Sequence, residues 1–399
     1  KETEFHILAP WKMGLLRKAA RRFSQQATTE TQEEFWQFCR NNSYWLDDYS
    51  LFMAFKRVFE GREWYLWDPE IVSRQSQALS TWKEQLAEET FLHRFIQFQF
   101  ARQWKSLRDY AHSKDVSFFG DLPIFVSSDS ADVWARQELF CLDAQGRPTL
   151  VSGVPPDYFS ETGQLWGNPI YRWDRMRENN YEWWIQRFRQ VFETSDYARI
   201  DHFRGFEAYW EIPAGEKTAV NGRWVKCPGD ELFQRVQQVL CRLPIIAENL
   251  GLITREVEDM RERFGFPGMA VEQFAFGGLD PACCHLPHNY LRQQVVYTGT
   301  HDNDTTQGWW QSLQRQDPRR SESEMEKERD FALRYLAPGD SDIHWATIRS
   351  LVRSAASWAI LPLQDVLGLG SEARMNQPST PSGNWRWRAE APQLTAALS

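Results

Sequence analysis

The chain has 399 residues and a formal net charge of −8 at pH 7, with 46 Lys and Arg against 54 Asp and Glu. This acidic balance argues against a polyanion such as nucleic acid as the main partner. No apolar run approaches the length that a membrane-spanning helix needs, so we expect no membrane partner either. The length suits either one barrel with insertions or two domains around a large core.

The six cysteines show no CxxC pair, and two of them, Cys283 and Cys284, are adjacent. This spacing indicates neither a zinc site nor a disulfide framework. His285 and His288 form HLPH, in which the proline favours a surface turn over a metal site. We therefore expect no metal and no other cofactor, reduced thiols and a cytoplasmic location. The first residue is Lys rather than Met, so we expect the chain to be part of a longer protein. A plastid is the alternative location if the missing N-terminal segment carried a transit peptide.

Residues 1–113 have helical spacing and mostly lack strand patterns. Phe35, Phe38 and Cys39 recur at helical intervals, and residues 73–113 keep an amphipathic pattern that predicts two or more helices. We expect residues 1–113 to form a helical subdomain that flanks or inserts into the rest of the fold.

A long stretch at residues 127–181 has little periodicity and is rich in Gly, Pro and aromatic residues. It is too aromatic for disorder, and long ordered loops in compact domains are usually functional. We therefore predict an ordered loop. Its aromatic side chains would either stack on the flat face of a sugar ring or pin the loop to the protein, and we expect some of each among Tyr158, Phe159, Trp166 and Tyr171.

From residue 114 onward the chain alternates between strands and helices. Strands are predicted near residues 116, 197, 243, 269, 295 and 358, with helices at about 230–242, 254–265, after 305, 321–335 and 344–357. Such alternation predicts a parallel sheet with crossover helices. Because a closed barrel needs eight strands, we expect an α/β fold: a (β/α)8 TIM barrel over residues 114–399 that holds strands three to eight and lacks the first two.

Three of the predicted strands end on or just before a carboxylate, at Asp201, Glu248 and Asp302. If the strands are parallel, these acids converge at one mouth of the barrel. Glycoside chemistry needs such a set, because one carboxylate attacks the sugar or activates water while a protonated one serves the leaving oxygen. The alternative interpretation is three unrelated acids that cap helices or pair with arginines.

A run of motifs in unbroken order carries a family resemblance. GDLPIFV, SGVPPDYFSETGQLWGNP, RIDHFRGFEAYW, PAGEKTAVNGRWVKCPG, IIAENLG, VVYTGTHDNDT and GNWRWR span Asp121 to Arg388. Together they resemble the 4-α-glucanotransferases called amylomaltase or disproportionating enzyme. Two departures stand out. Asn249 occupies a position where members usually have Asp, and the family's opening GVLLPLSSLPS-type segment, with the strand and loop that follow it, is absent from this sequence.

The resemblance implies a retaining α-glucan enzyme with Asp201 as nucleophile, Glu248 as acid/base and Asp302 as transition-state stabiliser. It further implies that Arg199 holds the nucleophile ionised and that His301 donates to sugar hydroxyls. The remaining residues that we expect to bind substrate are Gln164, Trp166, Asp121, Asp157, Tyr158 and Phe274.

The residue chemistry agrees with these roles. Arg199 and Asp201 lie two apart on a strand and so share a face, where a guanidinium favours the ionised carboxylate. Glu248 follows an apolar run, so partial burial would favour its protonated form.

We therefore expect transfer of α-1,4-glucan segments between maltooligosaccharides through a covalent glycosyl–Asp201 intermediate. The alternatives are an α-amylase-like retaining hydrolase and a non-catalytic glucan-binding fragment whose barrel is unclosed. The oligomeric state, the preferred glucan length and the activity of this chain by itself are left open by the sequence.

Overall fold

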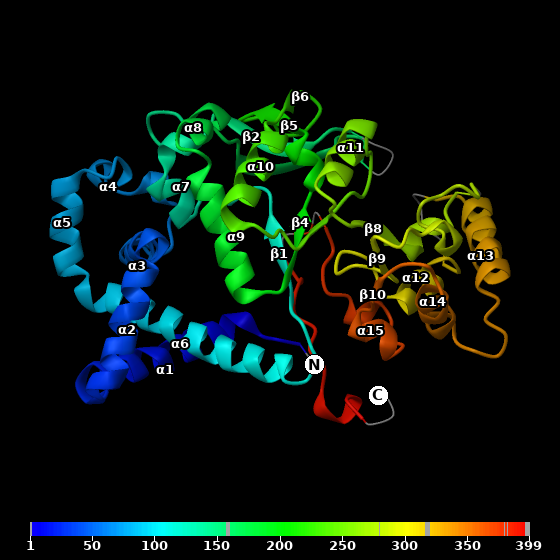
Figure 1. The fold of residues 1–399 in the computed structure, drawn as a ribbon, viewed down its shortest axis with the longest axis horizontal. Coiled ribbons are helices and arrows are strands. Elements are labelled where there is room, and N and C mark those ends of the chain that lie inside the picture. The colour runs from blue at the N-terminus through cyan, green and yellow to red at the C-terminus, as the bar shows by residue number, and fades with distance from the viewer. Residues whose placement is uncertain are drawn as a thin grey trace. The chain divides into compact units, whose positions relative to one another are not determined.

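The computed structural model describes residues 2–156, 160–278, 280–315, 320–378, 380 and 382–395 (Figure 1). The chain divides into two compact units. The first unit is Ala9–Ile245, and the second unit comprises Lys1–Leu8 and Ile246–Ser399.

The N-terminal part of the first unit is helical, as its apolar spacing predicts. The elements are α1 (Phe5–Gln26), α2 (Thr29–Asn41), α3 (Ser43–Val58), η1 (Trp64–Leu66), α4 (Pro69–Val72), α5 (Ser76–Gln85) and α6 (Ala87–His112). Helices α2, α3 and α6 contact one another around a core that includes Phe35, Leu46 and Phe95. Each such side chain contributes about 1.5–3 kcal/mol of burial, so packing between helices holds this region together.

Two parallel strands follow, β1 (Phe119–Pro123) and β4 (Tyr197–Asp201), and the sheet continues to β7 (Ile245–Ala247) in the order β1-β4-β7. In β4 the apolar Ala198 and Ile200 are buried, whereas Arg199 and Asp201 are only partly buried. The alternation read from the sequence is therefore confirmed. Helix α9 (Glu182–Thr194) packs along β1 and β4, and α10 (Gly229–Leu240) packs on α9 (Figure 1).

The prediction of a loop over residues 127–181 is wrong. This stretch contains α7 (Ala131–Ala135), η2 (Gln137–Leu139), β2 (Leu150–Val154), β3 (Gln164–Pro169) and α8 (Trp173–Glu178). The strands β2 and β3 join β5 (Ala208–Pro213) and β6 (Arg223–Lys226) in an antiparallel sheet of order β3-β2-β5-β6. The pairing of β2 with β3 is irregular, because two steps along β2 from Val151 to Gly153 face four steps along β3 from Pro169 to Leu165. In β2 itself three consecutive residues are buried, so the sequence carries no alternating strand pattern there.

The second unit holds three parallel strands in the order β10-β9-β8. They are β8 (Gly268–Val271), β9 (Gln294–Tyr297) and β10 (Trp358–Ile360), so all six expected strands form, and among the described residues no named strand precedes Phe119. The strand predicted near residue 269 ends at Val271, because the 3-10 helix η4 (Glu272–Ala275) follows it directly.

The second unit holds five α-helices in its described residues, and four of them lie where the sequence predicts helices. They are α11 (Arg255–Arg263), α12 (Thr306–Ser312), α13 (Glu322–Leu336), α14 (Ile343–Val352) and α15 (Leu363–Val366). The Thr305 hydroxyl accepts from the Gly308 N–H at the start of α12, and Ser321 with Glu324 forms a capping box on α13. The helix predicted for residues 344–357 ends five residues early, at Val352.

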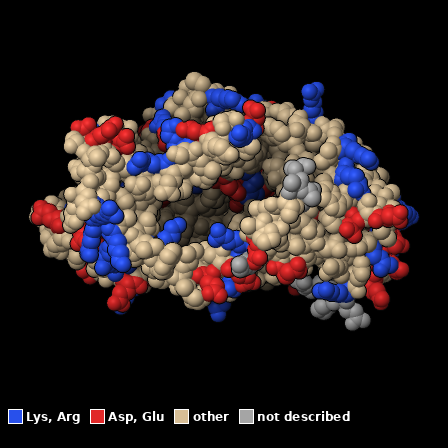
Figure 2. Space-filling view, turned by 90° about the horizontal axis from the view of Figure 1, so that it is seen from below, with Lys and Arg blue, Asp and Glu red and all other residues tan. Residues whose placement is uncertain are grey.

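The charged side chains of both signs are mixed on the surface. On the face drawn in Figure 2, acidic and basic side chains are interspersed among broad uncharged areas. None of the helices in the described parts of the chain is long and apolar enough to cross a membrane.

Candidate active site

Arg199 is the centre of the acidic cluster in the first unit. Its Nη2 lies 2.8 Å from Asp121 Oδ2 and 2.8 Å from Asp201 Oδ1, and its Nε donates to the same Asp121 oxygen at 3.1 Å. The parallel register explains this contact, because Asp121 on β1 is paired with Arg199 on β4. The guanidinium is 12% exposed while each carboxylate is 47% exposed, so the cation is fixed and the two acids remain accessible.

Trp166 lies beside the end of β4. Its ring meets the His202 ring edge-on at a centroid distance of 4.9 Å, and its indole N–H donates to Gln164 Oε1 at 3.1 Å. Both residues belong to β3, rather than to a loop as predicted. Gly153 on β2 permits this placement, since a Cβ there would lie 2.2 Å from the Gln164 carbonyl oxygen. Trp166 is 37% exposed, which leaves part of its ring open to a ligand.

His202 follows Asp201 directly and has a left-handed backbone, with φ of 52°. Such a conformation is costly for a residue with a side chain and is typical of functional turns. Burial, together with the smaller effect of the nearby Arg204 guanidinium, lowers the pKa of His202 to about 4. The ring is therefore neutral at pH 7 and adds no positive charge next to Asp201.

Glu248 follows β7 at the start of the second unit and is partly buried. Its Oε1 accepts the Leu250 N–H at 2.7 Å, which fixes the orientation of the carboxyl group. The next residue, Asn249, donates to Glu258 Oε1 at 2.7 Å and accepts the Met269 N–H at 2.7 Å. Asn249 thus has a donor role that the family's usual Asp cannot perform, because a carboxylate only accepts.

Asp302 lies in a turn five residues beyond β9, where a second segment of the chain supports it. Asn376 donates to Asp302 Oδ1 at 2.6 Å, and Arg374 donates to the Asp302 carbonyl at 2.6 Å. His301 Nε2 lies 3.6 Å from the same Oδ1, and the centroid of the His301 ring lies 5.2 Å from that of the Trp385 ring. Asp302 is 46% exposed and His301 33% exposed, so both remain open to a ligand.

Arg374 and Asn376 contact Asp302 but were not predicted as site residues. No local pattern distinguishes them, and only the fold brings them to Asp302. Trp385 falls within the quoted GNWRWR motif, and its left-handed backbone, with φ of 60°, turns it beside His301.

The other expected ligand-binding residues divide into three groups. Phe274 on η4 is 44% exposed and contacts His285, so its ring is available to a ligand. Of the two roles left open for the aromatic residues of this stretch, Tyr171 has the packing role, since it is 2% exposed and its hydroxyl donates to the Ile124 carbonyl at 2.6 Å. Asp157 and Tyr158, together with Phe159, lie outside the described residues.

In the parts of the chain that the structure describes, no three His, Cys, Asp or Glu side chains lie close enough together to hold a metal ion. His285 instead accepts the Val271 N–H through Nδ1 at 3.2 Å, and His288 hydrogen-bonds with the Tyr335 hydroxyl at 2.7 Å.

Comparison with known proteins gives consistent matches over nearly the whole chain. A family model described as 4-alpha-glucanotransferase matches residues 1–395. The 4-alpha-glucanotransferase of Thermus thermophilus is 48% identical over 395 residues, which cover 97% of this chain and 76% of that protein. The enzyme of the same name from Synechocystis sp. is 48% identical over 98% of this chain and 75% of its own length.

A solved structure supports the same grouping. Amylomaltase from Streptococcus agalactiae, in complex with acarbose, has a TM-score of 0.93 and 36% identity, covering all of this chain and 78% of that one. This likeness confirms the expected α/β fold of the TIM-barrel type.

Proposed function

Because this chain belongs to the 4-alpha-glucanotransferase family, we propose that it moves α-1,4-glucan segments between maltooligosaccharides by a retaining double displacement. Asp201 acts as the nucleophile, Glu248 as the general acid and base, and Asp302 as the group that stabilises positive charge on the reacting sugar. The two carboxylates handle both half-reactions, so the chemistry requires no cofactor.

In the first half-reaction, Asp201 attacks the anomeric carbon while Glu248 gives its proton to the glycosidic oxygen. The bond to the leaving chain breaks, and a glycosyl ester forms on Asp201. In the second half-reaction, Glu248 takes the proton of an acceptor 4-hydroxyl, whose oxygen attacks the anomeric carbon and frees Asp201. Two inversions give net retention of configuration.

The observation that carries this assignment is the double ion pair of Arg199. A nucleophilic carboxylate must be ionised, and the guanidinium 2.8 Å from Asp201 stabilises that form. Asp121 also binds this guanidinium, through Nη2 and Nε, so the position of Arg199 does not depend on Asp201 alone. The neutral His202 ring supports the edge of Trp166 next to this group.

For Asp302, the supporting observation is its hydrogen bond from Asn376. That bond orients one carboxylate oxygen and leaves the side chain nearly half exposed. We assign His301, Gln164 and Asp121 to sugar binding because their polar side chains are partly exposed, and Trp166 and Phe274 because their exposed rings can stack on a sugar.

The test is the product profile from maltotriose. Transfer yields both shorter and longer oligomers, whereas a hydrolase yields only glucose and maltose. Asp201→Asn should lower the rate of oligomer exchange by several orders of magnitude, because the covalent intermediate cannot form without its nucleophile. Asp174→Asn, which changes an exposed aspartate on α8, serves as the matched control and should retain full activity.

Each alternative outcome has a clear meaning. Glucose and maltose alone would replace the transferase proposal with a hydrolase. Unchanged maltotriose with intact glucan binding would indicate a non-catalytic binding protein. Full exchange by Asp201→Asn would overturn the assignment of the nucleophile.

A further inference from the structure

Helix α15, which follows β10 in the second unit, carries two buried polar side chains in succession. Gln364 is 6% exposed and Asp365 is 1% exposed. Burying a carboxyl or an amide group costs free energy unless hydrogen bonds replace the lost contacts with water. The hydrogen bonds of these two side chains therefore indicate what α15 holds in place.

The Asp365 carboxylate joins the two ends of the segment that carries Asp302. Its Oδ1 accepts the Thr306 N–H at 2.7 Å, and its Oδ2 accepts the Thr298 hydroxyl. Thr298 directly follows β9 and Thr306 begins α12, so Asp302 lies midway between them in the chain. Both threonines are fully buried. One carboxylate thus fixes the point where the turn with Asp302 leaves the sheet and the point where it enters the next helix.

Gln364 holds the second segment that supports Asp302. Its Nε2 donates to the Ala373 carbonyl at 3.1 Å. Directly beyond Ala373 come Arg374, which donates to the Asp302 carbonyl, and then Asn376, which donates to Asp302 Oδ1. Adjacent residues of one helix therefore hold both of the segments that meet at Asp302.

We propose that Asp365 is a positioning residue for Asp302, and that Gln364 assists it from the same helix. The proposal rests on the proposed function for the role of Asp302. A carboxylate that stabilises charge in a transition state depends on a preorganised position. Without Asp365, kcat should therefore fall while binding of the ground state changes little. If α15 only packed the fold, its loss would lower stability without this selective effect on kcat.

The experiment measures kcat and KM for oligomer exchange from maltotriose. Asp365→Ala should lower kcat about tenfold or more, with KM within about threefold of wild type. Asp365→Asn keeps both contacts, since its oxygen accepts the Thr306 N–H and its amide donates to the Thr298 hydroxyl. Its kcat should therefore stay within about twofold of wild type.

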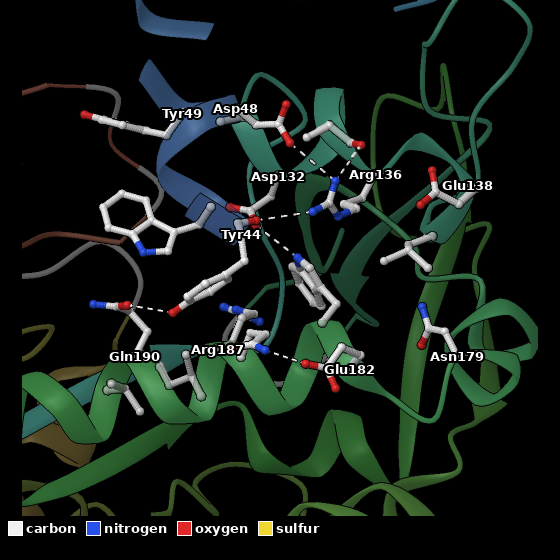
Figure 3. A pocket seen from close by; sticks show the side chains of 18 of the residues that line it. Tyr44, Asp48, Tyr49, Asp132, Arg136, Glu138, Asn179, Glu182, Arg187 and Gln190 are labelled. Carbon is white, nitrogen blue, oxygen red and sulfur yellow. Dashed lines mark hydrogen bonds and ion pairs between the residues drawn. The ribbon is translucent and has the colours of Figure 1, made fainter. Parts of the chain in front are cut away.

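Asp48→Ala is the matched control, because Asp48 is a partly buried aspartate that also joins two segments. It lines a cavity of about 550 Å³ in the first unit, where it pairs with Arg74 at 2.6 Å and with Arg136 at 3.4 Å (Figure 3). Its removal should lower the free energy of unfolding in urea, as removal of Asp365 does, yet leave kcat within about twofold of wild type.

A double-mutant cycle tests whether Asp365 acts through Asp302. The residual turnover of Asp302→Asn is followed with a glycosyl fluoride donor, whose good leaving group keeps slow variants measurable. In that background Asp365→Ala should lower kcat by less than about twofold. Thr298→Val guards against misfolding of Asp365→Ala, because it removes one hydroxyl at nearly constant size, and it should lower kcat about threefold.

Amide hydrogen exchange gives a measurement that does not depend on turnover. Over residues 298–306 the exchange should be about tenfold or more faster in Asp365→Ala than in wild type, and unchanged in Asp48→Ala, because only the first variant frees the ends of this segment.

A wild-type kcat for both Asp365→Ala and Thr298→Val would overturn the proposal. So would a loss of kcat on Asp365→Ala that is as large in the Asp302→Asn background as in wild type. Unchanged hydrogen exchange over residues 298–306 would overturn it whatever the activity of the wild-type chain. Failure of the proposed function shows separately, as the absence of oligomer exchange by the wild type or as full activity of Asp302→Asn.

Discussion

Because of Glu272, we expect the free energy of unfolding to fall as the pH rises. The residue follows β8 directly and is fully buried. Neither carboxylate oxygen has a hydrogen bond of normal geometry among the described residues, and the Ser350 hydroxyl offsets only part of the cost of burial. Burial raises the pKa of Glu272 to about 8, from an ordinary value of 4.5. The folded protein therefore keeps this carboxyl protonated at neutral pH.

The sign and size of the effect follow from linkage. Between pH 4.5 and 8 the unfolded chain has lost the proton while the folded chain retains it, so each pH unit lowers the free energy of unfolding by about 1.4 kcal/mol. From pH 5 to pH 8 the loss amounts to about 4 kcal/mol. Below the unfolded pKa the full stability is present, and above the folded pKa no further loss occurs.

Glu272→Gln removes the titrating group while keeping the size of the side chain. We expect urea unfolding of the wild type to lose about 4 kcal/mol between pH 5 and pH 8 beyond any loss in Glu272→Gln. Glu326→Gln, at an exposed position on α13, is the control and should follow the wild type. Parallel pH profiles for wild type and Glu272→Gln would refute the reasoning.

Three further substitutions test individual contacts. Trp166→Ala should weaken acceptor binding by about 1 kcal/mol and let water compete, so the ratio of reducing-end release to oligomer exchange should rise; an unchanged ratio would limit Trp166 to packing. Asn249→Asp puts a second carboxylate against Glu258 and should lower the free energy of unfolding by about 1–3 kcal/mol, and equal stability would contradict this. Asn376→Ala frees Asp302 Oδ1 and should lower kcat about tenfold with a smaller change in KM; a normal kcat would show that Asn376 has only a structural role.

Parts of this fold could be predicted because their signals are local. The alternation of Ala198 to Asp201 marks β4, and the capping residues Thr305 and Ser321 mark the starts of two helices. The antiparallel strands β2 and β3 could not be read in the same way. Their pairing depends on a register shift and on Gly153, whose missing side chain matters only once Gln164 approaches it.

The candidate site shows the same division. The carboxylates end predictable strands or follow them in motifs, so they could be named from the sequence. The support for Asp302 comes from Arg374 and Asn376, more than 70 positions away, and only tertiary structure brings them together. Tyr171 looked like other loop aromatics in the sequence, and only its burial against Ile124 assigns it to the core.

The account depends most on the covalent role of Asp201. The direct measurement is mass spectrometry of the denatured protein after incubation with a slow fluorinated α-glucosyl donor, followed by peptide mapping. The account predicts a glycosyl adduct on the peptide that contains Asp201, absent from Asp201→Asn and present in Asp174→Asn. An adduct on another residue, or none while the donor is consumed, would contradict it.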